Sequence, residues 1–361
     1  MDPRIREHAQ TIVDHSVDLQ AGDEIVIQLP PEAEELAVAL YELCGERGAT
    51  PTWLAGSDRA ARGFLLAAGE TYETPENRLA LFENTDVFIL ARGGSNVTER
   101  SDVPPTNTAA YKRATRALQE ERLSKRWCLT QVPTSGHAQL AGMSTEAYED
   151  FVYDAISLDW EAQREFQENM VTLLDAADEV HIVAGDETDL TLSVAGNTTL
   201  NDYGEKNLPG GEVFTAPVVD SVEGEVCFDI PLMRQGRKIE DVQLSFEGGE
   251  IVNHRAGRNE PLLTEILNTD DGVRRLGELG IGMNREIDQF TANMLFDEKM
   301  GDTVHLAVGS AYAETVGDDN TRNESAEHVD MIIDMSGASR IELDGEVVQR
   351  NGTFVFEDEF E

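Results

Sequence analysis

The N-terminal part of the chain alternates helix-like with strand-like segments, and this alternation restricts the possible folds more than any other feature. A helix-like segment, 2–19, precedes an apolar strand-like segment, 24–29, and a second helical segment opens on Pro31 and ends at Gly48. The alternation continues with strands at 50–56, 86–93 and 127–133 and with helices at 58–68 and 111–121. Strands joined by helices form parallel sheets, so we predict an α/β domain with a partly parallel sheet covered by helices.

The pattern changes near residue 178. One or two acidic helices are predicted between 144 and 177, and the chain then becomes a series of short strand-like segments separated by turn residues. A helix predicted at 259–276 interrupts this series. We therefore expect two domains, an α/β domain at 1–177 and an α+β domain at 178–361 with a β-rich or barrel-like core.

Charge is the strongest compositional signal. The 361 residues include 70 Asp and Glu but 28 Lys and Arg, which gives a formal net charge of −42. Nucleic acids and anionic membranes are therefore poor partners. Only five of the basic residues are lysines, and this bias resembles proteins from a salt-rich, halophilic cytoplasm. A Debye length of roughly 3 Å at about 1 M salt weakens repulsion between surface charges, so we expect salt to stabilise the fold.

The sequence also favours one cellular compartment. No N-terminal basic segment leads into an apolar run, and no stretch of about 18 apolar residues occurs, so we expect a cytoplasmic protein without a membrane partner. The cysteines, Cys44, Cys128 and Cys227, lie far apart and form no C-x-x-C pair. We interpret them as buried thiols and not as a disulfide framework or a zinc knuckle.

Two of the seven histidines occur in a pattern typical of metal ligands. His328 and Asp330 form H-x-D on a predicted strand, which places both side chains on one face. His305 lies on another predicted strand, shortly after Glu298 and a turn. Imidazole together with carboxylates suits zinc, cobalt or manganese. Each element alone is weak, because a histidine in an apolar strand is more often a hydrogen-bonded core residue.

Two glutamates lie in surroundings that do not suit a solvated surface charge. Glu212 follows a Gly-Gly turn, and Glu278 is flanked by glycines and apolar residues. A buried carboxylate needs a partner, and a cation is a good one. This argues against reading these two residues as part of the acidic surface.

Five segments carry a resemblance to a known family. They are GGEVFTAP at 210–217, GELGIG at 277–282, FDEKMGDTVHLAVG at 296–309, AYA at 311–313 and NESAEHVD at 323–330. These segments occur in the same order as in the thermophilic-type metalloaminopeptidases, the group of aminopeptidase T and aminopeptidase S. The chain resembles this family over essentially its whole length. The resemblance implies metal ligands at Glu212, Glu278, Glu298, His305, His328 and Asp330. It also implies a catalytic role for Tyr312, peptide substrates and a homodimer.

The chain departs from the family pattern at two places. The spacing between Glu298 and His305 is slightly longer than in the best-known members, so Asp297 or Asp302 could replace Glu298 as a ligand. His137 stands where an aromatic residue is expected. It could line the substrate cavity or be a plain structural histidine.

The implied ligand set suggests a mechanism. Six such ligands can hold two divalent ions, with Glu278 or Asp330 as the bridge. A water activated by the ions would attack the first peptide carbonyl, Glu278 would accept the proton, and Tyr312 would donate to the developing oxyanion.

Two other functions use the same residues. A two-metal phosphoesterase needs cations to hold the phosphate, and only Lys299 and Arg322 lie near the motifs, so this function is less well supported. A binding or scaffold protein that has lost catalysis is the second alternative. All six candidate ligands and Tyr312 are present, which argues against such a loss.

Overall fold

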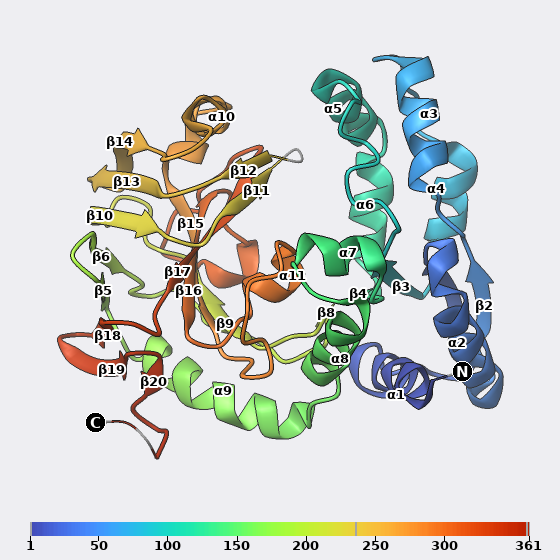
Figure 1. Cartoon of the computed structure of the whole chain (residues 1–361), viewed down its shortest axis with the longest axis horizontal. Coiled ribbons are helices and arrows are strands. Elements are labelled where there is room, and N and C mark those ends of the chain that lie inside the picture. Colours follow the sequence, from blue (N-terminus) through green and yellow to red (C-terminus); the bar gives the residue numbers. More distant parts are fainter. Residues whose placement is uncertain (1, 235–236, 359, 361) are drawn as a thin grey trace. The chain divides into compact units, whose positions relative to one another are not determined.

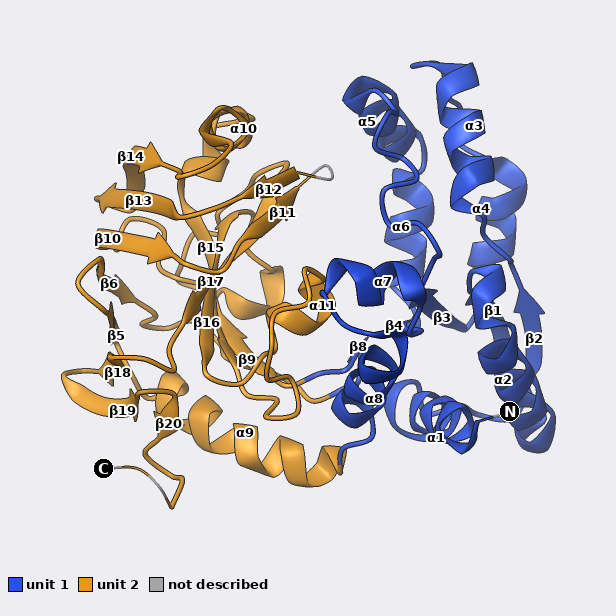
Figure 2. Cartoon of the chain, in the orientation of Figure 1, with its two compact units in different colours: residues 1–158, 204–210 blue, residues 159–203, 211–361 orange. Residues whose placement is uncertain are grey.

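The computed structural model describes residues 2–234, 237–358 and 360, and divides into two compact units. Unit 1 comprises residues 1–158 and 204–210, and unit 2 comprises residues 159–203 and 211–361 (Figure 2). The predicted boundary at 178 falls inside unit 2, because the helix before it packs with the strands that follow. None of the described helices has the length and apolarity needed to cross a membrane.

Unit 1 is built around a five-stranded sheet in the order β2-β1-β3-β4-β8, in which every neighbouring pair is parallel (Figure 1). Its strands are β1 (Glu24–Gln28), β2 (Thr50–Trp53), β3 (Val87–Arg92), β4 (Arg126–Gln131) and β8 (Asn207–Leu208). Its helices are α1 (Pro3–Thr11), η1 (Ile12–Ser16), η2 (Pro31–Ala33), α2 (Glu34–Arg47), α3 (Asp58–Ala68), α4 (Glu76–Glu83), α5 (Pro105–Ala114), α6 (Arg116–Leu123), α7 (Ser135–Leu140) and α8 (Thr145–Ile156). This confirms the predicted parallel α/β architecture.

Local chemistry explains where several of these helices begin and end. The side chains of Asp2, Ser57 and Ser144 accept hydrogen bonds from the first turns of α1, α3 and α8. Helix α2 ends at Gly48, whose φ of 75° is the left-handed conformation that glycine adopts without strain. The sequence therefore encodes these boundaries directly.

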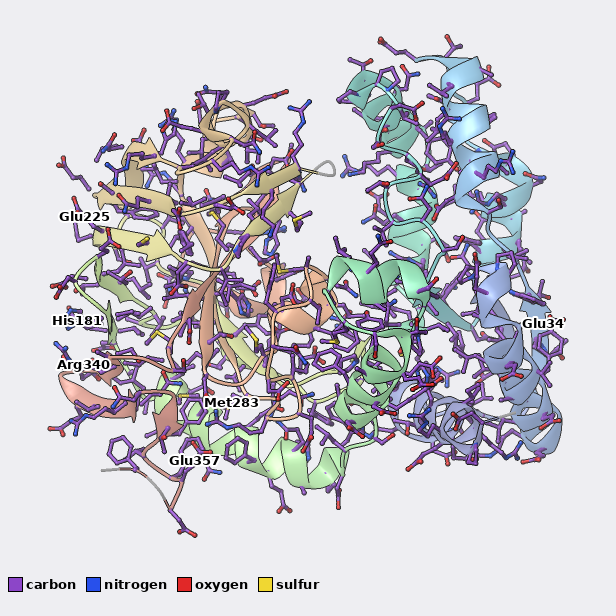
Figure 3. The ribbon with its side chains drawn as sticks, in the orientation of Figure 1. Glu34, His181, Glu225, Met283, Arg340 and Glu357 are labelled. Atoms are coloured by element: carbon purple, nitrogen blue, oxygen red, sulfur yellow. The ribbon has the colours of Figure 1, made fainter. Side chains whose placement is uncertain are left out.

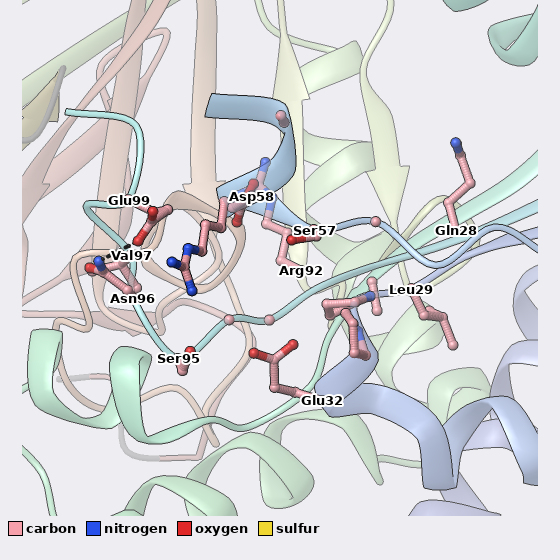
Figure 4. Close-up of a pocket in the computed structure, with 18 of the residues that line it drawn as sticks. Gln28, Leu29, Glu32, Ser57, Asp58, Arg92, Ser95, Asn96, Val97 and Glu99 are labelled. Carbon is pink, nitrogen blue, oxygen red and sulfur yellow. Dashed lines mark hydrogen bonds between the residues drawn. The ribbon is translucent and has the colours of Figure 1, made fainter. Parts of the chain in front are cut away.

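Unit 1 carries a pocket of about 760 Å³ at the carboxyl ends of its parallel strands (Figure 4). Gln28 and Leu29 line it at the end of β1, and Arg92 and Gly93 line it at the end of β3. The strand order reverses between β1 and β3, which is the position where open α/β sheets bind ligands. His137 also lines this pocket, so this histidine does face a cavity.

Unit 2 is rich in antiparallel strands. An eight-stranded sheet contains β5 (Glu179–Ala184), β6 (Thr188–Ser193), β10 (Glu223–Phe228), β13 (Val242–Glu247), β14 (Glu250–Arg255), β18 (Ser339–Leu343), β19 (Glu346–Arg350) and β20 (Thr353–Phe354). A five-stranded sheet contains β7 (Leu200–Asp202), β9 (Glu212–Thr215), β15 (Leu276–Gly282), β16 (Thr303–Gly309) and β17 (His328–Asp334), and β11 (Leu232–Arg234) pairs with β12 (Arg237–Ile239). The helices are α9 (Trp160–Asp175), α10 (Glu260–Ile266), η3 (Gly272–Arg274), α11 (Met294–Asp297) and η4 (Ala313–Thr315). The predicted β-rich α+β architecture is confirmed.

Two predicted helices are wrong in their extent. The helix predicted at 259–276 ends at Ile266, because the polar run Asn268–Gly272 forms a turn and Leu276 already begins β15. The helix predicted at 111–121 is two helices with a break at Thr115. The Thr115 hydroxyl donates to the Tyr111 carbonyl, a local bond that competes with helical hydrogen bonding.

The acidic surplus lies mainly at the surface. Figure 3 shows Glu34 on α2 and Glu225 on β10 pointing away from the ribbon, and both are exposed. The apolar core of unit 2 is continuous and includes Val180, Leu244 and Leu306. The few acids that are buried therefore stand out from the general pattern.

Candidate metal centre

The candidate site lies on the five-stranded sheet of unit 2, whose order is β17-β16-β15-β9-β7. Register places Gly280 of β15 opposite His305 of β16, and Gly282 opposite Glu212 at the start of β9. A bulge in β15 beside Glu278 shifts the register by one residue. Four neighbouring strands thus bring together predicted ligands that lie far apart in the sequence.

One group of donors consists of Glu212, Glu278 and His305. Each offers a ligand atom, and these atoms lie within 4.8 Å of one another. His305 Nε2 is 3.1 Å from Glu278 Oε1 and 3.4 Å from Glu212 Oε2. The glutamates expose only 6% and 5% of their surface, so the prediction that they are buried is confirmed.

A second group consists of Glu278, His328 and Asp330, also within 4.8 Å. His328 and Asp330 alternate on β17 and project to one face, and His328 Nε2 lies 3.3 Å from Asp330 Oδ1. The other ring nitrogen, Nδ1, donates to the Ser310 carbonyl at 2.7 Å. This bond orients the ring and leaves Nε2 for a metal ion. The two groups share Glu278.

The buried polar atoms fit divalent ions. Glu212 Oε2 and Glu278 Oε2 have no hydrogen-bond partner among the described residues, although both are shielded from solvent. An unpaired buried carboxylate oxygen is costly, and coordination to a cation removes that cost. Oxygen and imidazole donors together suit zinc, cobalt or manganese.

Without an ion the cluster holds protons. Burial raises the pKa of Glu212 to about 8, with the Lys299 charge opposing the rise. Burial alone would lower the pKa of His305, but its hydrogen bond to Glu278 and the surrounding carboxylates raise that pKa to about 9. Burial likewise opposes protonation of His328, and Asp330 and Glu278 raise its pKa to about 10. Protonated imidazoles thus balance the carboxylates.

The glycines of β15 make room for His305. A Cβ atom placed on Gly280 would lie 2.0 Å from His305 Nε2. This contact is with the ring atom that faces both glutamates. Glycine is therefore needed at position 280 to leave room for the His305 ring, and not for the backbone conformation of the strand.

The structure places Glu298 outside both donor groups. It caps the C-terminus of α11, and its Oε1 accepts a hydrogen bond from Lys299. The two alternatives lie elsewhere: Asp297 accepts from the backbone and hydroxyl of Thr291, and Asp302 pairs with Arg285. Neither acid belongs to a donor group among the described residues.

Two residues near the site were missed as partners by the sequence analysis. The sequence motifs indicate Lys299 only as a residue that could bind a phosphate, and they do not indicate Asp202 on β7. The register pairs Asp202 with Glu212 across β7 and β9. Lys299, one of only five lysines in the chain and adjacent to the predicted ligand Glu298, was the available signal.

Tyr312 follows β16 and lies beside the second donor group. Its ring centroid is 5.1 Å from that of His328 and 5.9 Å from that of Phe214, and 48% of the residue is exposed. Partial burial and the negative charges of Glu278 and Asp330 raise the pKa of the phenol. The hydroxyl therefore stays protonated and can donate a hydrogen bond.

Comparison with known proteins identifies the family. The family described as thermophilic metalloprotease (M29) matches residues 1–356. The chain belongs to the M29 metalloprotease family. It is 29% identical to aminopeptidase AmpS of Bacillus subtilis, over 98% of each chain, and 29% identical to aminopeptidase T of Thermus aquaticus, over 93% of each. The prediction of a metal-dependent hydrolase acting on peptide bonds is thereby confirmed.

Two solved structures share the fold of this chain, and the first of them is an aminopeptidase T. Wild-type AmpT from Thermus thermophilus matches with a TM-score of 0.86 and 26% identity, covering 98% of this chain and 99% of that one. A 2,5-dihydroxypyridine dioxygenase from Pseudomonas putida matches with a TM-score of 0.60 at 16% identity, which concerns the fold alone. The fold is thus shared across the whole length of both chains.

The close approach of Gly280 to His305 yields a first prediction. Gly280→Ala should displace the imidazole and lower divalent-ion affinity by about 10- to 100-fold, the usual cost of disturbing the orientation of a ligand. Ion content after dialysis, measured by elemental analysis, checks this. Gly337→Ala is the control, because its added Cβ would meet no atom within 4 Å. Equal ion content in both variants would contradict the assignment of His305.

The raised pKa values yield a second prediction. An ion must displace protons from His305 and His328, whose pKa values are about 9 and 10, so apparent ion affinity should rise from pH 7 to pH 10 and then level off. Titration calorimetry in buffers of different ionisation enthalpy measures the protons released. His181→Gln should leave the pH slope unchanged, because this histidine pairs with Asp189 and Glu342 away from the donor groups. A flat affinity over this range would be inconsistent with these protonation states.

Proposed function

We propose that the chain is an aminopeptidase that releases N-terminal amino acids from peptides with the help of two divalent ions. The observation that carries this proposal is the pair of donor groups that share Glu278, each with a buried carboxylate oxygen that accepts no hydrogen bond from the described residues. Shared carboxylates are the usual bridge of two-metal hydrolases. We assign zinc, cobalt or manganese to the ions from the mixed oxygen and nitrogen donors.

The residues have distinct tasks in this proposal. Glu212 and His305 would hold one ion, His328 and Asp330 would hold the other, and Glu278 would belong to both sites. When bound, such ions polarise the scissile carbonyl and lower the pKa of an attacking water. Glu278 is the carboxylate common to both groups, so we also assign it the proton transfer from water to the leaving amine.

Tyr312 stabilises the transition state in this proposal. Its phenol is protonated, half-exposed and adjacent to His328, so a substrate carbonyl near the second donor group lies within its reach. A hydrogen bond that forms on the developing oxyanion speeds the reaction without strengthening substrate binding.

The structure gives the phosphoesterase alternative less support than the sequence does. Lys299 Nζ forms ion pairs with Glu212, Glu298 and Asp202. These carboxylates neutralise its charge, so it does not bind a phosphate. Arg322 donates to the Ala311 carbonyl. Peptide hydrolysis needs no additional cation of this kind.

The activity itself is tested with aminoacyl chromogenic amides, offered with a free or a blocked α-amine. We expect cleavage of the free-amine substrates alone, loss of activity in a chelator, and recovery with zinc, cobalt or manganese. Equal cleavage of blocked substrates would indicate an endopeptidase. Cleavage that persists after complete removal of divalent ions would overturn the proposed mechanism.

Tyr312→Phe tests the oxyanion assignment. We expect the ions to be retained and kcat to fall about 10²- to 10³-fold, or about 2.7–4 kcal/mol, as for loss of one oxyanion donor elsewhere. Steady-state kinetics separates this fall from a change in KM. Tyr72→Phe serves as the control, because the Tyr72 hydroxyl donates to the Leu65 carbonyl in unit 1. An unchanged kcat would remove Tyr312 from the mechanism.

We further propose a cytoplasmic, salt-adapted homodimer. The family resemblance supports the dimer, and light scattering in high salt tests it. The charge of −42 supports salt adaptation, since exposed acids repel one another when screening is weak. The melting temperature should rise between about 0.1 M and about 3 M KCl, as the Debye length falls from roughly 10 Å to below 3 Å. A melting temperature independent of KCl would falsify the adaptation.

A further inference from the structure

Lys299 is the most unusual charged residue of unit 2. Its surface is 0% exposed, although lysine is almost never fully buried unless it is paired. Its Nζ lies 3.0 Å from Glu212 Oε1 and 3.8 Å from Asp202 Oδ2, and it donates to Glu298 Oε1. Three carboxylates therefore surround one ammonium at the edge of the candidate metal centre.

The backbone fixes Lys299 in this position. Its N–H donates to the Phe296 carbonyl at 2.9 Å, and its own carbonyl accepts from Asn284 N–H at 3.0 Å. The side chain thus enters the carboxylate cluster from a well-bonded turn after α11.

The two oxygens of Glu212 face different cations. Oε1 contacts the Lys299 ammonium, whereas Oε2 lies 3.4 Å from His305 Nε2 and has no hydrogen-bond partner in the part of the chain that the structure describes. Lys299 therefore orients the carboxylate so that one oxygen remains for a divalent ion. Glu298 Oε1 accepts a hydrogen bond from the same ammonium.

We propose that the Lys299 ammonium is a built-in cation of the metal centre, which keeps Glu298 and Asp202 away from the divalent ions and orients Glu212 toward them. Lys299 is a positioning residue in this scheme. The ligand set is then limited to Glu212, Glu278, His305, His328 and Asp330. The inference rests on the proposed two-metal function.

Charge balance supports this arrangement. The carboxylates of the combined cluster are Asp202, Glu212, Glu278, Glu298 and Asp330, which carry five negative charges when all are ionised. Two divalent ions and one ammonium supply five positive charges. A buried cluster is stable when its charges are compensated. Two divalent ions leave one negative charge uncompensated, and the ammonium neutralises it.

The decisive experiment compares ion binding by Glu298→Gln, Glu278→Gln and the full-length wild type, with Mn²⁺ as the probe. We expect Glu298→Gln to bind as many ions per chain as the wild type, with affinity changed by less than about tenfold, the low end of effects from groups that orient ligands. Glu278→Gln should lose ions. Loss of an ion by Glu298→Gln would overturn the inference, because Glu298 would then be a ligand.

A second measurement tests the ammonium itself. Lys299→Met should lower the melting temperature of the chelated protein, and Mn²⁺ should raise it by more than it does in the wild type, because more uncompensated charge faces the ions. Lys299→Arg should recover part of the loss. Lys238→Met is the matched control, since it removes a half-exposed lysine of the same unit. Chelated Lys299→Met that melts like the wild type would overturn the inference.

The outcomes separate the two proposals. If the wild type binds two ions and Glu298→Gln binds one, the two-metal function stands and the inference falls. If the wild type binds no ion, the two-metal function falls, and the melting of chelated Lys299→Met still decides whether the ammonium compensates the carboxylates. If Lys299→Met does not fold, the ion count of Glu298→Gln alone decides the inference.

Discussion

The structure of unit 2 depends on one constraint, the mutual repulsion of carboxylates buried on a single face of a β-sheet. Glu212 and Glu278 are shielded from water and lie close enough to contact the same imidazole. Several carboxylates at this spacing require cations: the chain supplies a buried lysine and, when no ion is bound, protonated histidines, and divalent ions would replace the histidine protons. The neighbouring glycines and hydrogen bonds are arranged around this requirement.

The sheet provides the rigidity that such a cluster needs. Antiparallel pairing fixes the positions of β9, β15, β16 and β17 to within a residue, because a slip by one would turn every side chain to the opposite face. Ligands placed on strands are held more precisely than ligands on loops. Glu298 and Tyr312 lie outside these strands, and they are the two residues whose assigned tasks depend least on register.

Two populations of acids coexist in this chain for different physical reasons. Exposed residues such as Glu34 and Glu225 are hydrated and raise the net negative charge, which salt screens. Buried residues such as Glu278 are not screened, and protein groups or ions must compensate them individually. Composition alone could not separate the exposed acids from the buried ones, since glutamate occurs in both groups.

The sequence by itself determined the alternation of strand and helix in unit 1, the change to short strands beyond it, and the M29 family through its ordered motifs. It also indicated Glu212 and Glu278 as buried acids, because glycines and apolar residues flank them. Periodicity did not locate the end of α10 or the break at Thr115, where polar turns and a hydroxyl bond compete with helix formation.

Only the tertiary structure decided which acids meet. Strand register brought Glu278 into both donor groups, whose members are distant in sequence, and set Asp202 beside Glu212. It also placed the Lys299 ammonium against Glu212, a contact between residues far apart in the sequence that no local pattern encodes. The physical reason is that electrostatic partners are chosen by distance and burial, and both arise only when strands far apart in the chain are paired.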